Sequence, residues 1–219
     1  MPLALYGHRF SSYTQKVLIA LYENDIPFEL RTIAPEQPDN VAEWLRRWPI
    51  AKFPLLVDGE RQVVEASTII EYLGINYPGP AWLIPADSSQ ALNIRFLDRF
   101  FDLYVMDPVQ LAVGAALGRI PMTAEDGRSV AKGRLERSYA WLETWLKGKT
   151  WANGETFSLA DCAAAPSLFY AAWTHPIGNE FPNTLAYRAR LLTRPSFARI
   201  VEEARVYRTL FPLGAPDRD

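Results

Sequence analysis

The sequence predicts a small α/β domain followed by an all-α domain. Short apolar runs with strand-like patterning occupy much of the first 65 residues, and Tyr77-Pro78-Gly79-Pro80 is the clearest break in the chain. After Pro85 the apolar residues recur only with helical spacing. These observations place the first domain at residues 1–78, a linker at 79–86 and the helical domain at 87–219.

The first domain starts with a short buried strand over residues 3–6 and a helix whose apolar face includes 17–22. That helix is expected to end at Asn24-Asp25, before Pro27. Residues 28–33 alternate with period two, as a half-buried strand does. The first two strands are joined by a helix, so they should run parallel.

A polar loop then leads to a helical segment around Trp44 and to the apolar run 53–57, which closes on a turn at Asp58-Gly59. A second short strand over 61–65 completes an antiparallel hairpin, and a helix is expected over 67–76. The predicted order is β-α-β-α-β-β-α.

The second domain shows helical spacing in two long runs. Leu97, Phe100, Phe101 and Tyr104 form the first; Leu135, Tyr139, Leu142 and Leu146 form the second. Another helix is expected over 197–204. A capping box over 158–161, with Asp161 in place of the usual Glu or Gln, should begin a further helix, which makes Asp161 structural and leaves Cys162 a buried, inert thiol.

Composition excludes several classes of function. The chain has 219 residues, of which 49% are hydrophobic and 22% charged, and a formal net charge of −2. Such a chain offers no reason to expect nucleic acid or a membrane as partner, and we expect neither a spanning helix nor a secretory signal. A single cysteine and two distant histidines, His8 and His175, argue against a disulfide and a metal site. A cytoplasmic location is the expectation.

Pro54 stands at the head of a strand-like run, where a proline belongs at the first position or in a special turn. If the Phe53–Pro54 bond is cis, the backbone N–H and C=O of Phe53 turn outward, where they can pair with a peptide. The segment therefore suggests a site for a small peptide.

Three patches of the chain resemble the soluble glutathione transferase family. They are 11–17 (SSYTQKV), 49–56 (PIAKFPLL) together with 65–67 (EAS), and 157–161 (FSLAD). The resemblance covers essentially the whole chain. It implies a thioredoxin-like domain followed by a helical bundle, glutathione as co-substrate, no metal, and a homodimer.

Two departures from the family pattern bear on activity. Members usually place serine directly after the acidic residue, but here Ala66 follows Glu65 and the serine comes at Ser67. The thiol-dependent branches, and the maleylacetoacetate isomerase branch with its Ser-Ser-Cys, have a cysteine at the start of the first helix, where this chain has Tyr13. This argues against a disulfide reductase.

Glutathione must lose its thiol proton to become a nucleophile. Lowering a thiol pKa from about 8.5 to about 6.5 requires about 2.7 kcal/mol of preferential thiolate stabilisation. One hydroxyl at a helix N-terminus suffices, since a hydrogen bond to a charged group contributes about 1.5–3 kcal/mol. The resemblance assigns this role to Ser11, six residues before Val17. Ser12 is the alternate donor, Tyr13 and Tyr6 are further candidates, and a serine at this position also caps a helix without any ligand.

The resemblance also assigns the glutathione-binding residues. The backbone of Phe53, held by Pro54, would meet the cysteinyl portion, and Lys52 would pair with the glycyl carboxylate. Glu65 would meet the α-ammonium of the γ-glutamyl group. Its α-carboxylate would meet the Ser67 hydroxyl and the first N–H groups of the helix expected over 67–76. Because Ala66 lacks a hydroxyl, we expect weak glutathione affinity.

A second-substrate pocket is expected between the domains, against the first helix of the bundle. Pro108 would kink that helix and open the pocket. The candidates for its apolar lining are Tyr13, Phe101, Tyr104, Val105 and Leu111.

The leading interpretation is a transferase that adds the glutathione thiolate to small, hydrophobic electrophiles. A catalytically silent, glutathione-transferase-like binding or scaffold protein is the second, and the Ala66 departure favours it. A glutathione-dependent isomerase or dehalogenase is the third.

Overall fold

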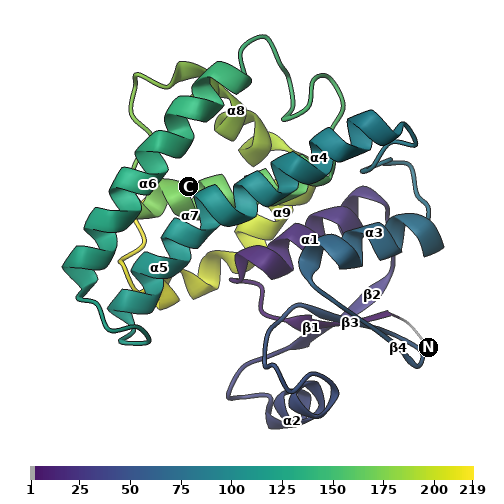
Figure 1. The fold of residues 1–219 in the computed structure, drawn as a ribbon. Helices are drawn as coiled ribbons and strands as arrows, with labels where there is room; N and C mark the ends of the chain where they lie inside the picture. Colours follow the sequence, from purple (N-terminus) through teal and green to yellow (C-terminus); the bar gives the residue numbers. More distant parts are fainter. Residues whose placement is uncertain (1–2) are drawn as a thin grey trace.

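A four-stranded mixed sheet forms the base of the first domain in the computed structural model, which describes residues 3–219 (Figure 1). Its strands are β1 (Leu3–Gly7), β2 (Phe28–Thr32), β3 (Leu55–Asp58) and β4 (Arg61–Val64), in the spatial order β2-β1-β3-β4. β1 runs parallel to β2, whereas β3 is antiparallel to both β1 and β4. The parallel pair and the hairpin agree with the sequence prediction.

Three helices cover the two faces of this sheet. They are α1 (Ser12–Glu23), α2 (Pro38–Arg47) and α3 (Ala66–Asn76). α1 and α3 lie together on the face toward the helical domain, and α2 lies on the other face (Figure 1). α1 is buried on nearly all sides because it packs between the sheet and the helical domain. α2 buries only Trp44, in a small separate core with Tyr6, Leu55 and Val57.

Residues 77–87 carry no helix or strand and lead into the all-helical second domain. Its elements are α4 (Ser88–Phe100), the π-helical segment η1 (Phe101–Met106), α5 (Asp107–Ala116), α6 (Ala124–Trp145), α7 (Leu159–Thr174), α8 (Pro182–Thr193), α9 (Pro195–Ala204) and the 3₁₀ segment η2 (Arg205–Leu210). The α/β domain joined to an all-helical domain confirms the predicted fold class. None of the helices within residues 3–219 has the length and apolar character needed to cross a membrane.

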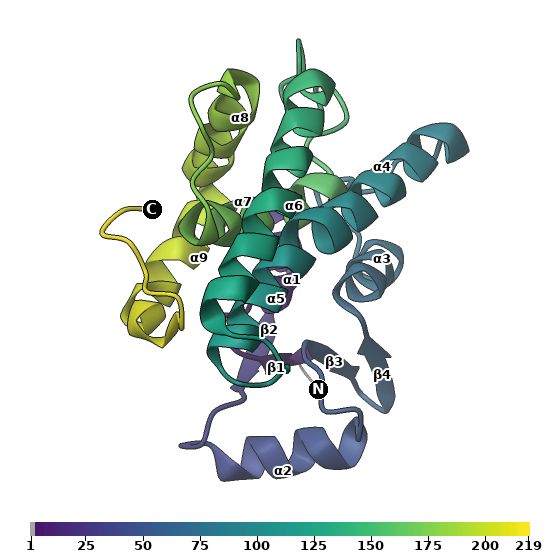
Figure 2. The same ribbon diagram turned by 60° about the vertical axis from the view of Figure 1, so that its left-hand side comes forward.

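α7 is the central helix of the molecule, and its neighbours include helices of both domains (Figure 2). It contacts α1 of the first domain, and α4 and η1 of the second. Its residues 159–173 are all buried, Cys162 among them, as the sequence predicted for that thiol. Burial raises the pKa of this thiol well above its usual value, which keeps it protonated.

Pro108 explains the π-helical segment between α4 and α5. Proline has no N–H, so it cannot donate to the carbonyl of Tyr104 four residues earlier. The hydroxyl of Ser138 on α6 donates to that carbonyl instead, at 2.6 Å. Proline thus widens the helix through η1, where the spacing alone predicted a regular α-helix.

Asp161 does more than cap α7. Its carboxylate accepts hydrogen bonds from the N–H and the hydroxyl of Ser158, both at 2.9 Å, as well as from the N–H of Ala152 at 2.8 Å and the hydroxyl of Tyr187 at 2.6 Å. The predicted capping box is present, and the Ser158 hydroxyl also donates to the carboxylate. Asp161 therefore joins α7, α8 and the preceding loop.

Replacing this aspartate should destabilise the fold strongly. Asp161→Ala leaves several buried donors without a partner, so we expect the free energy of unfolding to fall by about 3 kcal/mol or more. Chemical denaturation measures this loss. The control is Asp126→Ala at the third residue of α6, whose carboxylate accepts from the hydroxyl of the exposed N-cap Thr123, and a loss below about 1 kcal/mol is expected. Equal losses in the two variants would contradict the proposed role of Asp161.

Candidate active site

A cavity of about 520 Å³ lies between the two domains, within the range of small-molecule sites. Its walls come from the start of α1, the loop before β3, helix α5 and the segment after η2. The lining residues are His8, Phe10, Ser11, Ser12, Tyr13, Ile33, Ala51, Lys52, Phe53, Met106, Val109, Gln110, Val113, Leu117, Arg119, Tyr170, Leu210, Phe211 and Pro212.

Ser11 and Ser12 bring two hydroxyl groups to this cavity. Ser11 is the N-cap of α1, and its Oγ accepts a long hydrogen bond of 3.4 Å from the N–H of Thr14. Capping uses only a lone pair of the oxygen, so the hydroxyl proton stays available to a ligand. Ser12 is buried, and its Oγ has no hydrogen-bond partner within residues 3–219. Either hydroxyl can therefore donate to a group in the cavity.

Lys52 and Phe53 form the opposite wall, before β3. The Phe53–Pro54 peptide bond is cis, in agreement with the hypothesis from the sequence. The backbone N–H and C=O of Phe53 make no hydrogen bond within the described part of the chain. Pro54 itself is buried. The ammonium of Lys52 has no ion pair among residues 3–219.

Two tyrosines and a histidine considered from the sequence fall in different places. Tyr13 lines the cavity, and burial raises the pKa of its phenol, which keeps it a neutral donor. Tyr6 lies in the core beneath α2 instead. His8 lies in the cavity wall, where its Nδ1 accepts from the N–H of Phe10 at 3.1 Å; burial lowers the pKa of the imidazole, so it is neutral near pH 7.

The helical wall of the cavity differs from the one expected. Phe101 and Val105 are fully buried in the core, and Tyr104 lies beside Trp141 in a separate groove. Leu111 is half-buried and is not part of the lining. The π-helical segment η1 changes the register of the helix, so that the residues reaching the cavity are Met106, Val109, Gln110 and Val113. Regular helical spacing could not reveal this shift.

Glu65, Ala66 and Ser67 lie outside the cavity lining, at the start of α3. Glu65 is exposed, has a positive φ of 68° and makes no side-chain hydrogen bond to the helix it precedes. Such a conformation is uncommon for a residue other than glycine and is typical of functional sites. Ala66 is buried.

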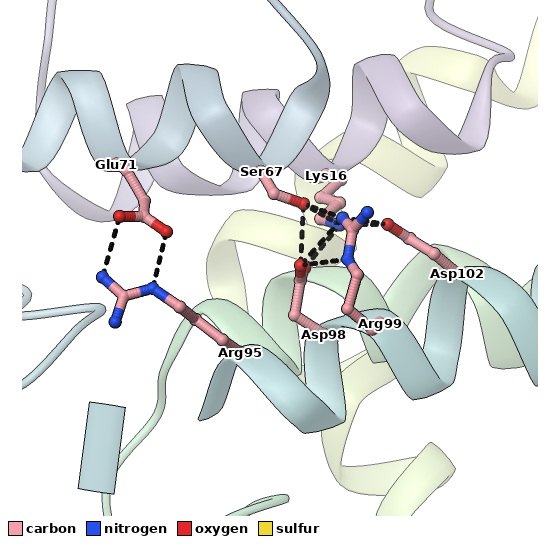
Figure 3. Close-up of polar contacts among 7 residues, drawn as sticks. All are labelled: Lys16, Ser67, Glu71, Arg95, Asp98, Arg99 and Asp102. Atoms are coloured by element: carbon pink, nitrogen blue, oxygen red, sulfur yellow. Dashed lines mark hydrogen bonds and ion pairs between the residues drawn. The ribbon is translucent and has the colours of Figure 1, made fainter. Parts of the chain in front are cut away.

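The Ser67 side chain takes part in an ionic cluster between the domains. We call Lys16, Ser67, Asp98, Arg99 and Asp102 the interdomain charge cluster (Figure 3). The Nζ of Lys16 lies 2.5 Å from Asp98 Oδ1 and 2.9 Å from Asp102 Oδ2, and it donates to Ser67 Oγ at 2.9 Å. The hydroxyl of Ser67 in turn donates to Asp98 Oδ2 at 2.7 Å.

Burial makes the interdomain charge cluster energetically important. The Lys16 side chain is only 1% exposed, and Asp98 is equally inaccessible. Burial raises the pKa of the Asp102 carboxyl, while the neighbouring ammonium of Lys16 acts in the opposite direction. Desolvation makes such groups costly unless each charge is paired. The cluster therefore requires the two domains to stay in register.

Sequence patterns do not single out Lys16, Asp98, Arg99 or Asp102. One signal was present: Lys16 directly precedes the apolar run 17–21 in a helix that is buried on nearly all sides, where a lysine needs a partner. Nothing in the sequence pattern identified that partner, which lies 82 residues away at Asp98 (98 − 16).

Together, the fold and the cavity define a class of protein: a sheet domain that presents a cis-proline loop and a helix N-terminus, joined to a helical domain that closes the cavity. Two ranges of the chain match models of one protein family. Residues 5–81 match the glutathione S-transferase N-terminal domain, and residues 102–195 match its C-terminal domain. The chain belongs to the glutathione S-transferase family, and this membership supports glutathione binding and a glutathione transferase activity.

Relatives of known identity match over nearly their whole length. A glutathione S-transferase of Hyoscyamus muticus is 24% identical over 92% of this chain and 99% of the relative. A probable maleylacetoacetate isomerase of Vibrio cholerae is 26% identical over 93% of this chain and 97% of the relative. The crystal structure of a glutathione S-transferase from Methylobacillus flagellatus, with glutathione bound, is 25% identical over 90% of this chain and 98% of that chain, with a TM-score of 0.77.

Removing the buried ammonium of Lys16 should destabilise the protein more than removing an exposed one. Lys16→Met leaves Asp98 and Asp102 buried with one cation between them, so we expect a loss of about 3–5 kcal/mol at neutral pH. The Lys16 ammonium lowers the pKa of the Asp102 carboxyl, so this pKa rises in the folded variant when the ammonium is lost. The loss relative to the unsubstituted protein should therefore shrink as the pH falls and this carboxyl takes up a proton.

Urea denaturation at several pH values measures this effect. The control is Lys132→Met, which removes an exposed lysine paired with Glu136 on α6 and should change the free energy of unfolding by less than about 1 kcal/mol. A loss in Lys16→Met that does not depend on pH would contradict the electrostatic explanation.

Proposed function

We propose that the protein is a glutathione transferase that conjugates the glutathione thiolate to small, largely apolar electrophiles. The observation that carries the proposal is the cavity, whose lining brings Ser11 and Ser12 together with Phe53. A thiol donor and an apolar acceptor fit there together, because the remaining wall from α5 and the chain end is mostly apolar.

Ser11 is the proposed thiol-stabilising residue. Its hydroxyl donates to the sulfur of glutathione and, with the N-terminus of α1, favours the thiolate over the thiol. The thiol proton leaves to solvent, the sulfur forms a bond to the electrophilic carbon, and the leaving group departs with its electron pair. Ser12 is the alternate donor, since a buried hydroxyl without a partner gains most from a ligand.

The remaining residues of the proposed glutathione site hold the peptide. Phe53 presents its unpaired backbone groups to the cysteinyl portion, and Pro54 fixes the turn that exposes them. Lys52 supports the glycyl carboxylate from the cavity rim. Glu65 pairs with the α-ammonium of the γ-glutamyl group, and the N–H groups at the start of α3, from Ala66 and Ser67, pair with its α-carboxylate. The Ser67 hydroxyl, predicted from the resemblance to meet this carboxylate as well, already donates its one proton to Asp98.

The second-substrate pocket of the proposal uses Tyr13 together with Met106, Val109 and Val113. These side chains surround the position that the sulfur would take beside Ser11. Phe101 and Val105 are buried in the core, Tyr104 lies in a separate groove, and Leu111 is not part of the lining.

A glutathione-dependent isomerase is the second candidate, and a relative of this chain named as a probable maleylacetoacetate isomerase favours it. The cavity lining contains Arg119 and Lys52 but no acidic residue, so an anionic substrate is also accommodated. Isomerisation would use the same thiolate and would return glutathione unchanged. A binding or scaffold role, suggested by Ala66, would need neither conjugation nor isomerisation.

We also propose a cytoplasmic homodimer. Reduced glutathione is maintained in reducing compartments, where a chain with one cysteine needs no disulfide. On α4 and η1 the apolar side chains Leu92, Phe96, Leu103 and Tyr104 are exposed. Phe96 packs against Trp141 and Trp145 of α6, and Leu103 and Tyr104 share a groove with Trp141. Exposed apolar surface of this kind is typical of a subunit interface.

The test of the main proposal is conjugation of glutathione to 1-chloro-2,4-dinitrobenzene. The unsubstituted protein should bind glutathione and form the conjugate. Ser11→Ala should raise the pKa of the bound thiol by about 1–2 and lower the rate at pH 6.5 by about 10- to 100-fold, with the fold intact. Ultraviolet absorbance of the bound thiolate during a pH titration measures the pKa.

Thr123→Ala is the matched control, because it removes an N-cap hydroxyl from α6, outside the cavity lining. It should leave both the thiol pKa and the rate unchanged. If Ser11→Ala behaves like this control and Ser12→Ala shows the loss, the role belongs to Ser12. Glutathione binding without any turnover would favour the scaffold role, and absence of both would refute the transferase.

The proposed dimer is tested with charged substitutions on α4. Leu92→Glu combined with Phe96→Glu places two carboxylates in the apolar surface, so we expect a shift from dimer to monomer in sedimentation velocity experiments. Val206→Glu on η2, another exposed apolar position, is the control and should remain dimeric. A monomeric unsubstituted protein would contradict the proposal.

A further inference from the structure

The proposed glutathione site has a gap at its γ-glutamyl end. The first residue of α3 is Ala66, whose methyl group offers no hydrogen bond to an α-carboxylate. The next hydroxyl, that of Ser67, already donates to Asp98 at 2.7 Å. A carboxylate at this position therefore needs another donor from this chain.

Arg99 of α4 lies at this place, although it belongs to the other domain (Figure 3). Its Nη2 lies 2.5 Å from Ser67 Oγ, 2.9 Å from Asp102 Oδ2 and 3.0 Å from Asp98 Oδ2. These contacts fix one edge of the guanidinium beside the first turn of α3.

The other edge of the guanidinium is open. Nη1 of Arg99 makes no hydrogen bond or ion pair within residues 3–219, and the side chain is 50% exposed, whereas Lys16, its partner cation, is 1% exposed. A guanidinium carries five N–H donors in a rigid fork, so one held edge leaves the other edge oriented for a carboxylate.

The charges at this place match an amino-acid head group. The interdomain charge cluster has two cations and two anions, and so is neutral by itself. Glu65 adds an exposed carboxylate close enough to act electrostatically on Arg99. The α-amino and α-carboxyl groups of a γ-glutamyl residue form a zwitterion, which adds no net charge and pairs with Glu65 and Arg99 respectively.

We propose that Arg99 binds the α-carboxylate of the γ-glutamyl group of glutathione through its free edge and so supplies the donor that Ala66 lacks. This inference rests on the proposed function and adds a binding residue from the helical domain. Recognition of the γ-glutamyl group is then shared by both domains, through the cluster that holds them together. A purely structural Arg99 would stabilise the interface without distinguishing one ligand from another.

Calorimetric titration of the full chain with two peptides tests the proposal. One is glutathione, and the other is 4-aminobutanoyl-Cys-Gly, the same peptide without the α-carboxylate. The unsubstituted protein should bind glutathione about tenfold or more tightly than the analogue, as expected for a hydrogen bond to a charged group. Arg99→Gln should weaken glutathione binding by a similar factor, with little effect on the analogue, so that the ratio of the two Kd values approaches one.

Arg95→Gln is the matched control. Arg95 lies one turn earlier on α4 and pairs with Glu71 of α3 across the same interface, at 2.8 Å (Figure 3). The Arg95→Gln variant should leave the ratio of the two Kd values unchanged. Thermal unfolding shows whether each variant is folded. Arg99→Lys keeps a cation beside the buried carboxylates; because it loses the fork, it should lower the ratio only in part.

The outcomes separate this inference from the proposed function. An unchanged ratio in both Arg99 variants overturns the role of Arg99. Equal binding of the two peptides by the unsubstituted protein also overturns it, while the glutathione transferase proposal stands. A protein that binds neither peptide overturns both proposals.

Discussion

The ion pairing of Lys16 with Asp98 and Asp102 joins the two domains of the molecule. Burying an ammonium that is 1% exposed is costly unless counter-ions pair with it, and the helical domain supplies both carboxylates. The pairing fixes α4 against α1 and α3, and thereby places η1 and α5 over the start of α1. The cavity between the domains has its shape because this register is fixed.

The same short segments of the first domain serve both the interface and the proposed site. α1 begins with Ser11 at the cavity and one turn later carries Lys16 into the interdomain charge cluster. α3 begins at the proposed γ-glutamyl position and directs Ser67 into the same cluster. The hydroxyl of Ser67 and the guanidinium of Arg99 thus belong both to the contact between the domains and to the proposed γ-glutamyl position.

The two domains contribute different parts of the proposed chemistry. The sheet domain supplies the groups for the peptide and the thiol: an unpaired backbone at Phe53 and hydroxyls at a helix N-terminus. Neither role needs a titrating side chain in the cavity, and burial indeed keeps His8 and Tyr13 neutral. The helical domain supplies the apolar wall, and Pro108 with Ser138 sets the register that decides which residues face the cavity. Differences in η1 and α5 would thus change the electrophile while leaving the thiol site intact.

The two-domain fold, the hairpin at Asp58-Gly59 and the family resemblance could be predicted from the sequence, because these depend on local periodicity, turn residues and motif spacing. The cis state of the Phe53–Pro54 bond was a hypothesis that only the structure tested. The sequence also identified Ser11, Ser12, Tyr13, Lys52 and Phe53, which the structure brings to one cavity. Only the tertiary structure decided which helical residues line that cavity, since the π-helical segment shifts the register that Phe101, Tyr104 and Val105 were expected to follow. It alone revealed the partners of Lys16, because a buried charge shows in a sequence that it needs a counter-ion but not where the counter-ion lies.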